Sequence, residues 1–154
     1  MDVKSKVLAL KYRPVVFNDI IGQKIVSDAI FNAIKNDKTP NAYLFTGIRG
    51  VGKTTFARIV AKALNCKNKV DNLCKENLCE NCFSISNSNN IDVIEIDAAS
   101  KTSVDDVRDL IDLSRYGPTN SKYKIFIIDE VHMLSKQAFN ALLKTLEEPP
   151  EYLK

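Results

Sequence analysis

One short stretch of the chain constrains the fold more than any other. Gly47, Gly52, Lys53 and Thr54 fill every required position of the pattern G-x-x-x-x-G-K-[ST]. Glycines in such a loop let backbone N–H groups turn inward around phosphate oxygens, because no Cβ crowds the anion or resists a positive φ. The lysine places a full charge at the β- and γ-phosphates, and the threonine hydroxyl can ligate Mg²⁺. The pattern indicates a binding site for a nucleoside triphosphate.

The residues around this loop have the order that such a site requires. An apolar run over 42–46 predicts a strand that leads into the loop. After the loop, apolar residues recur at the spacing of one helix face: Phe56, Ile59, Val60, Ala63 and Leu64. A helix beginning there directs its free N–H groups and positive dipole end at the phosphates. A glycine-rich turn that matches by chance is the alternative, and the flanking elements argue against it.

We assign nucleotide binding to the whole loop: Gly47, Ile48, Arg49, Gly50, Val51, Gly52, Lys53, Thr54 and Thr55. Magnesium would be held by Thr54 and by Asp129, discussed next.

A pair of carboxylates follows the segment 124–128, in which residues 125–128 form an unbroken apolar run that predicts a parallel strand buried on both faces. Charged side chains are costly at the end of a buried strand unless they serve a ligand, and open α/β sheets bind ligands at that edge. We assign Asp129 to Mg²⁺, through water, and Glu130 to orienting and deprotonating the attacking water. Lys53 joins Glu130 as a catalytic residue. Two acids in an ordinary strand-end turn are the alternative, and the preceding phosphate loop disfavours it.

The rest of the chain alternates helical and extended patterns. An arm with turns is expected over 1–23, a helix over 24–36 and a strand over 91–97. Two further helices are predicted to begin after the capping serines Ser103 and Ser135. This order of elements predicts an α/β fold with a parallel sheet flanked by helices.

His132 follows the carboxylate pair by two positions. A lone histidine without other ligands nearby is more often a packed or capping residue than a metal ligand. We therefore expect it to be structural.

The four cysteines all fall in one polar, asparagine-rich segment, about 65–90: Cys66, Cys74, Cys79 and Cys82. Cysteines of a cytosolic protein in such a segment are metal ligands more often than core thiols or disulfides. Cys79-x-x-Cys82 has the spacing that places two thiolates on one Zn²⁺, and the other two can complete a tetrahedron. The metal would supply folding free energy that a small segment with few apolar residues lacks. Four unliganded thiols are the alternative.

The bulk composition fits one modest domain with its own core: 154 residues, 45% of them hydrophobic and 27% charged. No apolar run approaches the length of a membrane span, so we expect a cytoplasmic protein with no membrane partner. The net charge of +3 is too small to indicate a nucleic-acid partner, and it does not argue against one.

Six blocks of sequence, in order, resemble the gamma/tau subunits of bacterial DNA polymerase III, which are AAA+ ATPases that drive the sliding-clamp loader. The blocks are Lys11-Tyr-Arg-Pro14, Ile21-Gly-Gln23, the loop Gly47–Thr54, Glu95-Ile-Asp-Ala-Ala-Ser100, Ile128-Asp-Glu-Val-His132 and Ala141-Leu-Leu-Lys-Thr-Leu-Glu-Glu-Pro-Pro150. The resemblance extends from about Val7 to the last residue, and a cysteine insertion at this place is itself a trait of that family.

The resemblance implies ATP, Mg²⁺ and a structural Zn²⁺ as cofactors, with the adenine base beneath Tyr12, Arg13 and the 21–23 segment. It implies that ATP binding and hydrolysis load the sliding clamp onto primed DNA during replication, together with other clamp-loader subunits. Lys101 would contact a DNA phosphate; an ordinary solvated lysine is the alternative. Two departures stand out. The interval from Cys74 to Cys79 is longer than usual, and Ile48 replaces a common threonine whose side chain points away from phosphate.

Members of the family are longer than this chain, and continue through a further strand with a sensor residue, an arginine finger, a lid and a collar domain. Residues 1–154 would be the N-terminal portion of the AAA+ domain, ending after the third core strand. The next strand would lie between the loop's strand and that of Asp129. We therefore expect exposed strand edges, weak or no nucleotide binding and negligible hydrolysis by this chain alone. A catalytically idle assembly fragment is one alternative, and a helicase of the D-E-x-H type, suggested by Asp129–His132, is another.

Overall fold

The computed structural model describes residues 8, 12–68, 70–100 and 103–154, and the statements below refer to these residues. Lys101, expected to contact DNA, lies outside the described residues. In chain order the elements are η1 (Phe17–Asp19), α2 (Lys24–Lys35), α3 (Lys53–Asn65), η2 (Val70–Asn72), α4 (Glu80–Ser86), β1 (Val93–Asp97), α5 (Val104–Ser114), β2 (Ile125–Asp129), η3 (Val131–Met133) and α6 (Lys136–Glu147).

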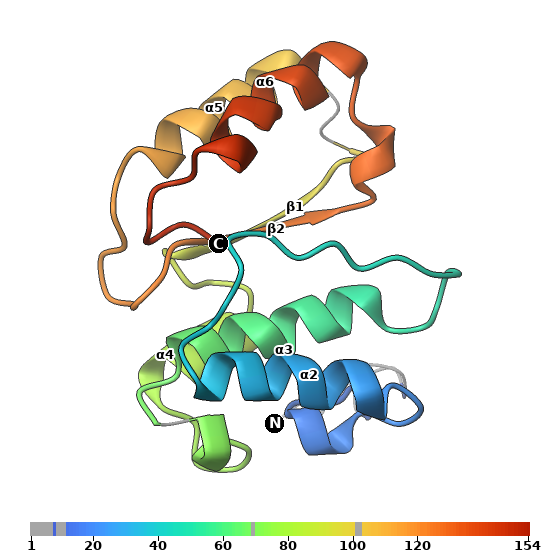
Figure 1. Cartoon of the computed structure of the whole chain (residues 1–154), viewed down its shortest axis with the longest axis vertical. Helices are drawn as coiled ribbons and strands as arrows, with labels where there is room; N and C mark the ends of the chain where they lie inside the picture. Colours follow the sequence, from blue (N-terminus) through green and yellow to red (C-terminus); the bar gives the residue numbers. More distant parts are fainter. Residues whose placement is uncertain (1–7, 9–11, 69, 101–102) are drawn as a thin grey trace, which may run out of the picture.

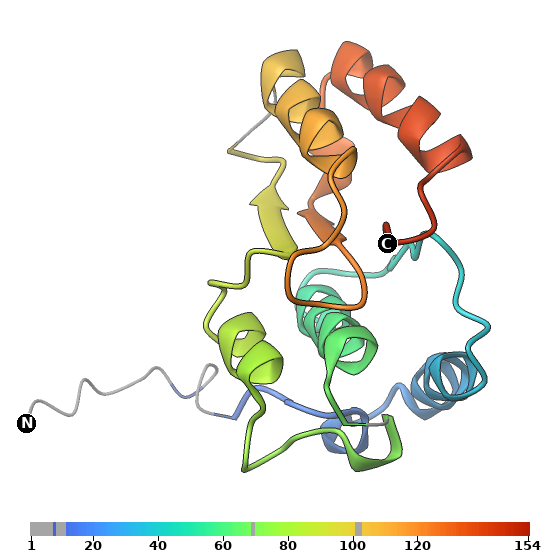
Figure 2. The ribbon, with the colours of Figure 1, turned by 90° about the vertical axis from the view of Figure 1, so that its left-hand side faces the viewer.

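A parallel pair of strands separates two groups of helices (Figure 1). β1 pairs with β2 in a register that sets Val93 opposite Ile125 and Asp97 opposite Asp129. Helices α5 and α6 pack together on one face of the pair, while α3, with α2 and α4 beside it, covers the other. Figure 2 shows the same three layers from the side. The parallel α/β arrangement expected from the sequence is confirmed.

Two hydrophobic cores lie on opposite faces of the strands. The larger is formed by α2, α3 and the cysteine segment together with Ile125 and Ile127 of β2. The smaller lies between α5, α6 and the strand ends, where Ile128 packs. Alternate residues of β2 thus contribute to different cores, as the period-two geometry of a strand requires. The prediction of a strand buried on both faces is confirmed.

Both capping serines act as expected. The Ser103 hydroxyl accepts a hydrogen bond from the Asp106 N–H at 3.2 Å, and the Ser135 hydroxyl accepts one from the Ala138 N–H at 3.2 Å. Each serine thereby satisfies an N–H group that has no partner inside its own helix. The helices α5 and α6 begin at the positions that these residues indicate.

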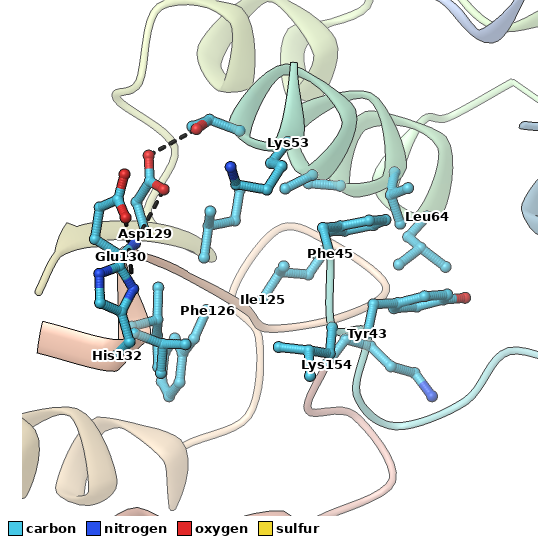
Figure 3. A pocket seen from close by; sticks show the side chains of 18 residues that line it. Tyr43, Phe45, Lys53, Leu64, Ile125, Phe126, Asp129, Glu130, His132 and Lys154 are labelled. Atoms are coloured by element: carbon cyan, nitrogen blue, oxygen red, sulfur yellow. Dashed lines mark hydrogen bonds and ion pairs between the residues drawn. The ribbon is translucent and has the colours of Figure 1, made fainter. Parts of the chain in front are cut away.

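The strand predicted over 42–46 is wrong. The segment is extended, with Tyr43 and Phe45 turned inward and stacked at 6.2 Å, but among the described residues it pairs with no strand. Instead, a cavity of about 180 Å³ separates it from β2 (Figure 3). A strand requires a hydrogen-bonded neighbour, and this segment has none.

The free edge of β2 is partly occupied by the last residues described. The Lys124 N–H donates to the Tyr152 carbonyl at 2.8 Å, and the Phe126 N–H donates to the Lys154 carbonyl at 2.9 Å. Residues 152–154 therefore run parallel to β2 along the edge that faces the cavity. The cavity lining is mainly apolar and includes Tyr43, Phe45, Leu64 and Ile125. The unpaired strand edges expected from the sequence are therefore found only in part, because residues 152–154 pair with the start of β2 and the 42–46 segment is extended without a described partner.

We predict that Phe56→Ala lowers the free energy of unfolding by about 3–5 kcal/mol, because it empties the centre of the larger core. The Phe56 ring is buried and lies 6.1 Å from that of Phe17 and 5.3 Å from that of Phe45. Urea denaturation followed by circular dichroism measures the change. Phe83→Ala is the control, because Phe83 is 57% exposed and should change stability by less than about 1 kcal/mol. Equal losses in the two variants would contradict this account of the core.

Candidate functional site

The phosphate-loop residues form the turn that leads into α3. Gly50 and Gly52 have φ of 89° and 92°, in the left-handed region that favours glycine. An added Cβ at either position would meet no atom within 4 Å, so backbone conformation rather than space requires glycine. Gly52 is the N-cap of α3, and its carbonyl accepts from the Phe56 N–H at 2.8 Å. The loop therefore presents the free N–H groups of the first turn of α3 to its concave side.

Lys53 lies over this loop. Its ammonium group donates to the Gly47 carbonyl at 3.0 Å and to the Ile48 carbonyl at 3.1 Å. The positive charge is thus held beside the loop backbone at the start of α3. Ile48 is 79% exposed, and its expected orientation away from phosphate stays a prediction.

A direct hydrogen bond joins the loop helix to the carboxylate strand. The Thr54 hydroxyl donates to Asp129 Oδ2 at 2.6 Å, across 75 positions of sequence (Figure 3). The other carboxylate oxygen, Oδ1, accepts from the Glu130 N–H at 3.0 Å. A hydroxyl and a carboxylate side by side are oxygen ligands of the kind that Mg²⁺ takes. These two residues, paired as the sequence analysis expected, could therefore hold that cation together with phosphate oxygens.

Glu130 leaves the strand in a left-handed conformation, with φ 50° and ψ 43°. Such a conformation is uncommon for a residue with a side chain, and it turns the carboxylate away from the line of β2. The Glu130 carboxylate lies 3.6 Å from Nδ1 of His132. His132 is not packed as the first of the two expected roles required, because its side chain is 70% exposed beside this carboxylate. η3 is too short a turn to bury it.

An ion pair between α3 and β1 was missed by the sequence analysis. Arg58 of α3 makes a bidentate pair with Glu95 of β1, with N···O distances of 2.6 and 2.8 Å and both side chains about one quarter exposed. The Arg58–Glu95 pair therefore links β1 to α3. The available signal was an acidic residue between two isoleucines inside a strand, on a face that the fold covers with a helix.

Arg13, expected near the base, approaches the site from the N-terminal arm. Its Nε donates to the Thr55 hydroxyl at 2.8 Å. Burial and the nearby Arg58 guanidinium lower the pKa of Arg13, while Glu95 and Asp129 oppose that change. The arginine is therefore close to the carboxylate strand as well as to the loop. Tyr12 is 73% exposed.

The four cysteines gather at one point. Their sulfur atoms all lie within 4.8 Å of one another, with Cys74 and Cys82 buried and Cys66 and Cys79 at intermediate exposure. Cys74, set apart by its longer spacing, approaches Cys66 with a sulfur–sulfur distance of 3.5 Å. A set of four thiol donors at this separation fits one tetrahedral metal ion.

The environments of these thiols differ. Burial raises the pKa of Cys82 and of Cys66. Burial also acts to raise the pKa of Cys79, but hydrogen bonds from the backbone of Lys67 and Cys82, and from neighbouring thiols, lower it to about 7. A bound dication would offset the cost of holding all four sulfurs as thiolates.

The cysteine segment packs on the loop helix rather than standing alone. It contains the short helix α4, which was not predicted and which contacts α3. Val70 and Ile85 from this segment are buried in the larger core. The segment therefore draws part of its stability from apolar contacts that its polar composition did not suggest.

Comparison with known proteins identifies the family. The family model described as "DNA polymerase III, delta subunit" matches residues 22–153. The chain belongs to this family. It is 54% identical over 150 residues to the DNA polymerase III subunit tau/gamma of Haemophilus influenzae, a match that covers 97% of this chain and 22% of that protein. It is 50% identical over 149 residues to the tau subunit of Escherichia coli, covering 97% of this chain and 23% of that protein.

A third relative is the gamma subunit of Buchnera aphidicola subsp. Baizongia pistaciae, 50% identical over 149 residues, which are 96% of this chain and 40% of that protein. The chain thus spans between about one fifth and two fifths of the length of these relatives. The resemblance to gamma/tau subunits of DNA polymerase III is confirmed. Among the described residues, no helix combines the length and apolar character needed to traverse a lipid bilayer.

We predict that Glu95→Gln lowers the free energy of unfolding by about 1–2 kcal/mol, because it leaves the Arg58 guanidinium partly buried without its counter-charge. The control is Asp112→Asn, which removes an exposed ion pair with Arg115, and which should change stability by less than about 0.5 kcal/mol. Thermal and urea denaturation of the three proteins measure both values. A loss no larger than that of the control would contradict a bracing role for the Arg58–Glu95 pair.

Proposed function

We propose that this chain is the nucleotide-binding part of an AAA+ ATPase subunit of the DNA polymerase III clamp loader. The observation that supports this best is the Thr54–Asp129 hydrogen bond, because it brings the phosphate loop and the carboxylate strand into one site. The family relationship supports membership of the polymerase assembly. In the intact subunit, ATP binding would order the ring of subunits that opens the sliding clamp on primed DNA, and hydrolysis would release both.

Each residue of the site has a proposed chemical role. The amides of residues 47–55 bind the phosphates, and the Lys53 ammonium neutralises charge that develops on the γ-phosphate. Thr54 and Asp129 hold Mg²⁺, which supplies a Lewis acid at the phosphate oxygens when bound. Glu130 orients the attacking water and accepts its proton. Its position directly after Asp129, turned out of the strand, suits this role.

Recognition of the base is proposed for Tyr12 and Arg13 with residues 21–23. Arg13 already contacts the loop through Thr55, so a base held by the N-terminal arm would lie next to the phosphates. Lys101 remains a proposed contact to DNA phosphate, and the other clamp-loader subunits and the sliding clamp are proposed partners. We place the chain as the N-terminal portion of the ATPase domain over 1–154, with the cysteine insertion at about 65–90.

The paired strands lack the neighbour that would close the sheet around the cavity beside Phe45. For this reason a second candidate function, an assembly fragment whose nucleotide loop is idle, is supported by one specific observation: the 42–46 segment pairs with no described strand. Among the described residues, the loop is then joined to the sheet mainly through α3 and its Thr54–Asp129 hydrogen bond. Pre-organisation of the phosphate site would be weaker than in a complete sheet.

The 154-residue chain alone should bind ATP with a dissociation constant above about 100 μM and hydrolyse it negligibly. A version extended to the length of the gamma relatives should bind and hydrolyse it. Isothermal titration and phosphate release measure the two properties. Micromolar affinity with turnover by the short chain would contradict the role assigned to the incomplete sheet.

The extended protein provides the test of the proposed function. Glu130→Gln should retain ATP binding and lose hydrolysis by about 10²-fold or more, so that ATP remains bound uncleaved. Lys53→Ala should lose binding itself. Lys144→Ala, at an exposed lysine of α6, is the control and should leave binding and hydrolysis unchanged. If Glu130→Gln leaves turnover unchanged, the assembly-fragment function is favoured instead.

We propose that the cysteine cluster binds one structural Zn²⁺. The purified chain should contain about one zinc ion, and chelation should lower its melting temperature by roughly 5 °C or more. Cys74→Ser and Cys82→Ser should each lose the metal, whereas Ser86→Ala, exposed on α4, should retain it. Elemental analysis measures the content. Full zinc content in Cys74→Ser would remove that residue from the ligand set.

A further inference from the structure

The loop helix and the carboxylate strand are fastened to each other at both ends. At one end, the Thr54 hydroxyl donates to Asp129. At the other end, the Asn65 side chain pairs with the backbone of Tyr123: its amide N–H donates to the Tyr123 carbonyl at 2.9 Å, and its carbonyl oxygen accepts from the Tyr123 N–H at 2.9 Å. Asn65 thus reproduces the two hydrogen bonds that a neighbouring strand would make.

The spacing of these two contacts matches the geometry of the two elements. Thr54 and Asn65 are eleven residues apart in α3, a helical rise of roughly 17 Å. Tyr123 and Asp129 are six residues apart in an extended chain, a span of roughly 20 Å. Because the lengths are similar, fixing one end against the helix largely fixes where the other end falls. A shift of Tyr123 along α3 would move Asp129 away from Thr54.

Asn65 is itself held by the cysteine segment. Asn81 lies between Cys79 and Cys82 in the sequence. Its side-chain amide donates to the backbone carbonyl of Asn65 at 2.9 Å and to the backbone carbonyl of Asn120 at 3.5 Å. Asn65 and Asn81 are only 2% and 4% exposed. Buried amides with satisfied hydrogen bonds are costly to displace, since each would leave an unpaired polar group.

We propose that Asn65 and Asn81 are positioning residues, through which the cysteine cluster sets the place of Asp129 in the nucleotide site. The assignment of Asp129 to the nucleotide site rests on the proposed function. The physical coupling does not: the cluster orients Asn81, Asn81 fixes the end of α3, and Asn65 fixes the start of β2. The cysteine segment then acts on the nucleotide site from the far end of α3, without touching a phosphate.

Hydrogen exchange of the 154-residue chain without nucleotide tests this coupling separately from ATP binding. The informative amides are those of Ala98, which donates to the Asp129 carbonyl at 3.0 Å, and Glu130, which donates to Asp129 Oδ1. Asn65→Ala should speed their exchange by about tenfold or more, because the variant loses both buried hydrogen bonds between the Asn65 side chain and Tyr123. Amides of α5 and α6 away from the strand ends should keep their rates.

Asn81→Ala is the second variant. It leaves the Asn65–Tyr123 hydrogen bonds in place, so it should speed exchange of the same amides by a smaller factor. Chelation of the wild-type chain should also speed the Ala98 and Glu130 amides, and should add less in Asn81→Ala than in the wild type. Asn36→Ala is the matched control. Asn36 is the C-cap of α2, and its side-chain amide donates to the Asn32 carbonyl at 2.8 Å, within the same helix end, so the Ala98 and Glu130 amides should be unaffected.

Exchange that rises only at residues 120–124 in the Asn65 and Asn81 variants would overturn the proposal, because the asparagines would then act locally. A uniform rise over α5 and α6 as well would also overturn it, since this indicates general loss of stability. If the pattern is as expected but the extended protein fails to bind ATP, the coupling stands and the proposed function fails.

Discussion

The packing of α3 against β2 is the interaction on which the other features depend. The apolar face of α3 makes the larger core, so the same contact that stabilises the chain also aligns the helix with the strand. At the start of the helix this alignment brings Thr54 to Asp129, and at its end it brings Asn65 to Tyr123. The two halves of the proposed phosphate and metal site belong to elements that are buried against each other, which would hold them together at the sheet edge.

The cysteine segment extends this arrangement instead of forming a separate unit. Its apolar residues Val70 and Ile85 enter the core of α3, and Asn81 bonds the last residue of that helix. The four sulfur atoms lie close together although the described elements of the segment, η2 and α4, are short. Metal binding and core packing would therefore stabilise the same helix from the end opposite to the phosphate loop.

Patterns that depend on neighbouring residues were predictable from the sequence. The caps at Ser103 and Ser135, the glycine loop and the apolar strand before Asp129 rely on local hydrogen bonding and periodicity, and they lie where expected. Features that need a distant partner were not. The 42–46 segment has strand composition but no neighbouring strand among the described residues, and the position of Glu95 inside a strand indicated a need for a partner without indicating Arg58, 37 positions away. α4 was missed because its stability comes from contact with α3.

The sequence by itself determined the chemistry of this protein: a loop that can take phosphate, an acid pair at a strand end and four thiols in one segment. Residue type and spacing carry that information, because the ligands of an anion or a metal are set by donor atoms and local backbone freedom. Only the tertiary structure decided how these parts are joined. The contacts of Thr54 with Asp129 and of Asn65 with Tyr123 link residues 75 and 58 positions apart. Contacts over such separations form when α3 and β2 bury their apolar faces together, and no local pattern encodes them.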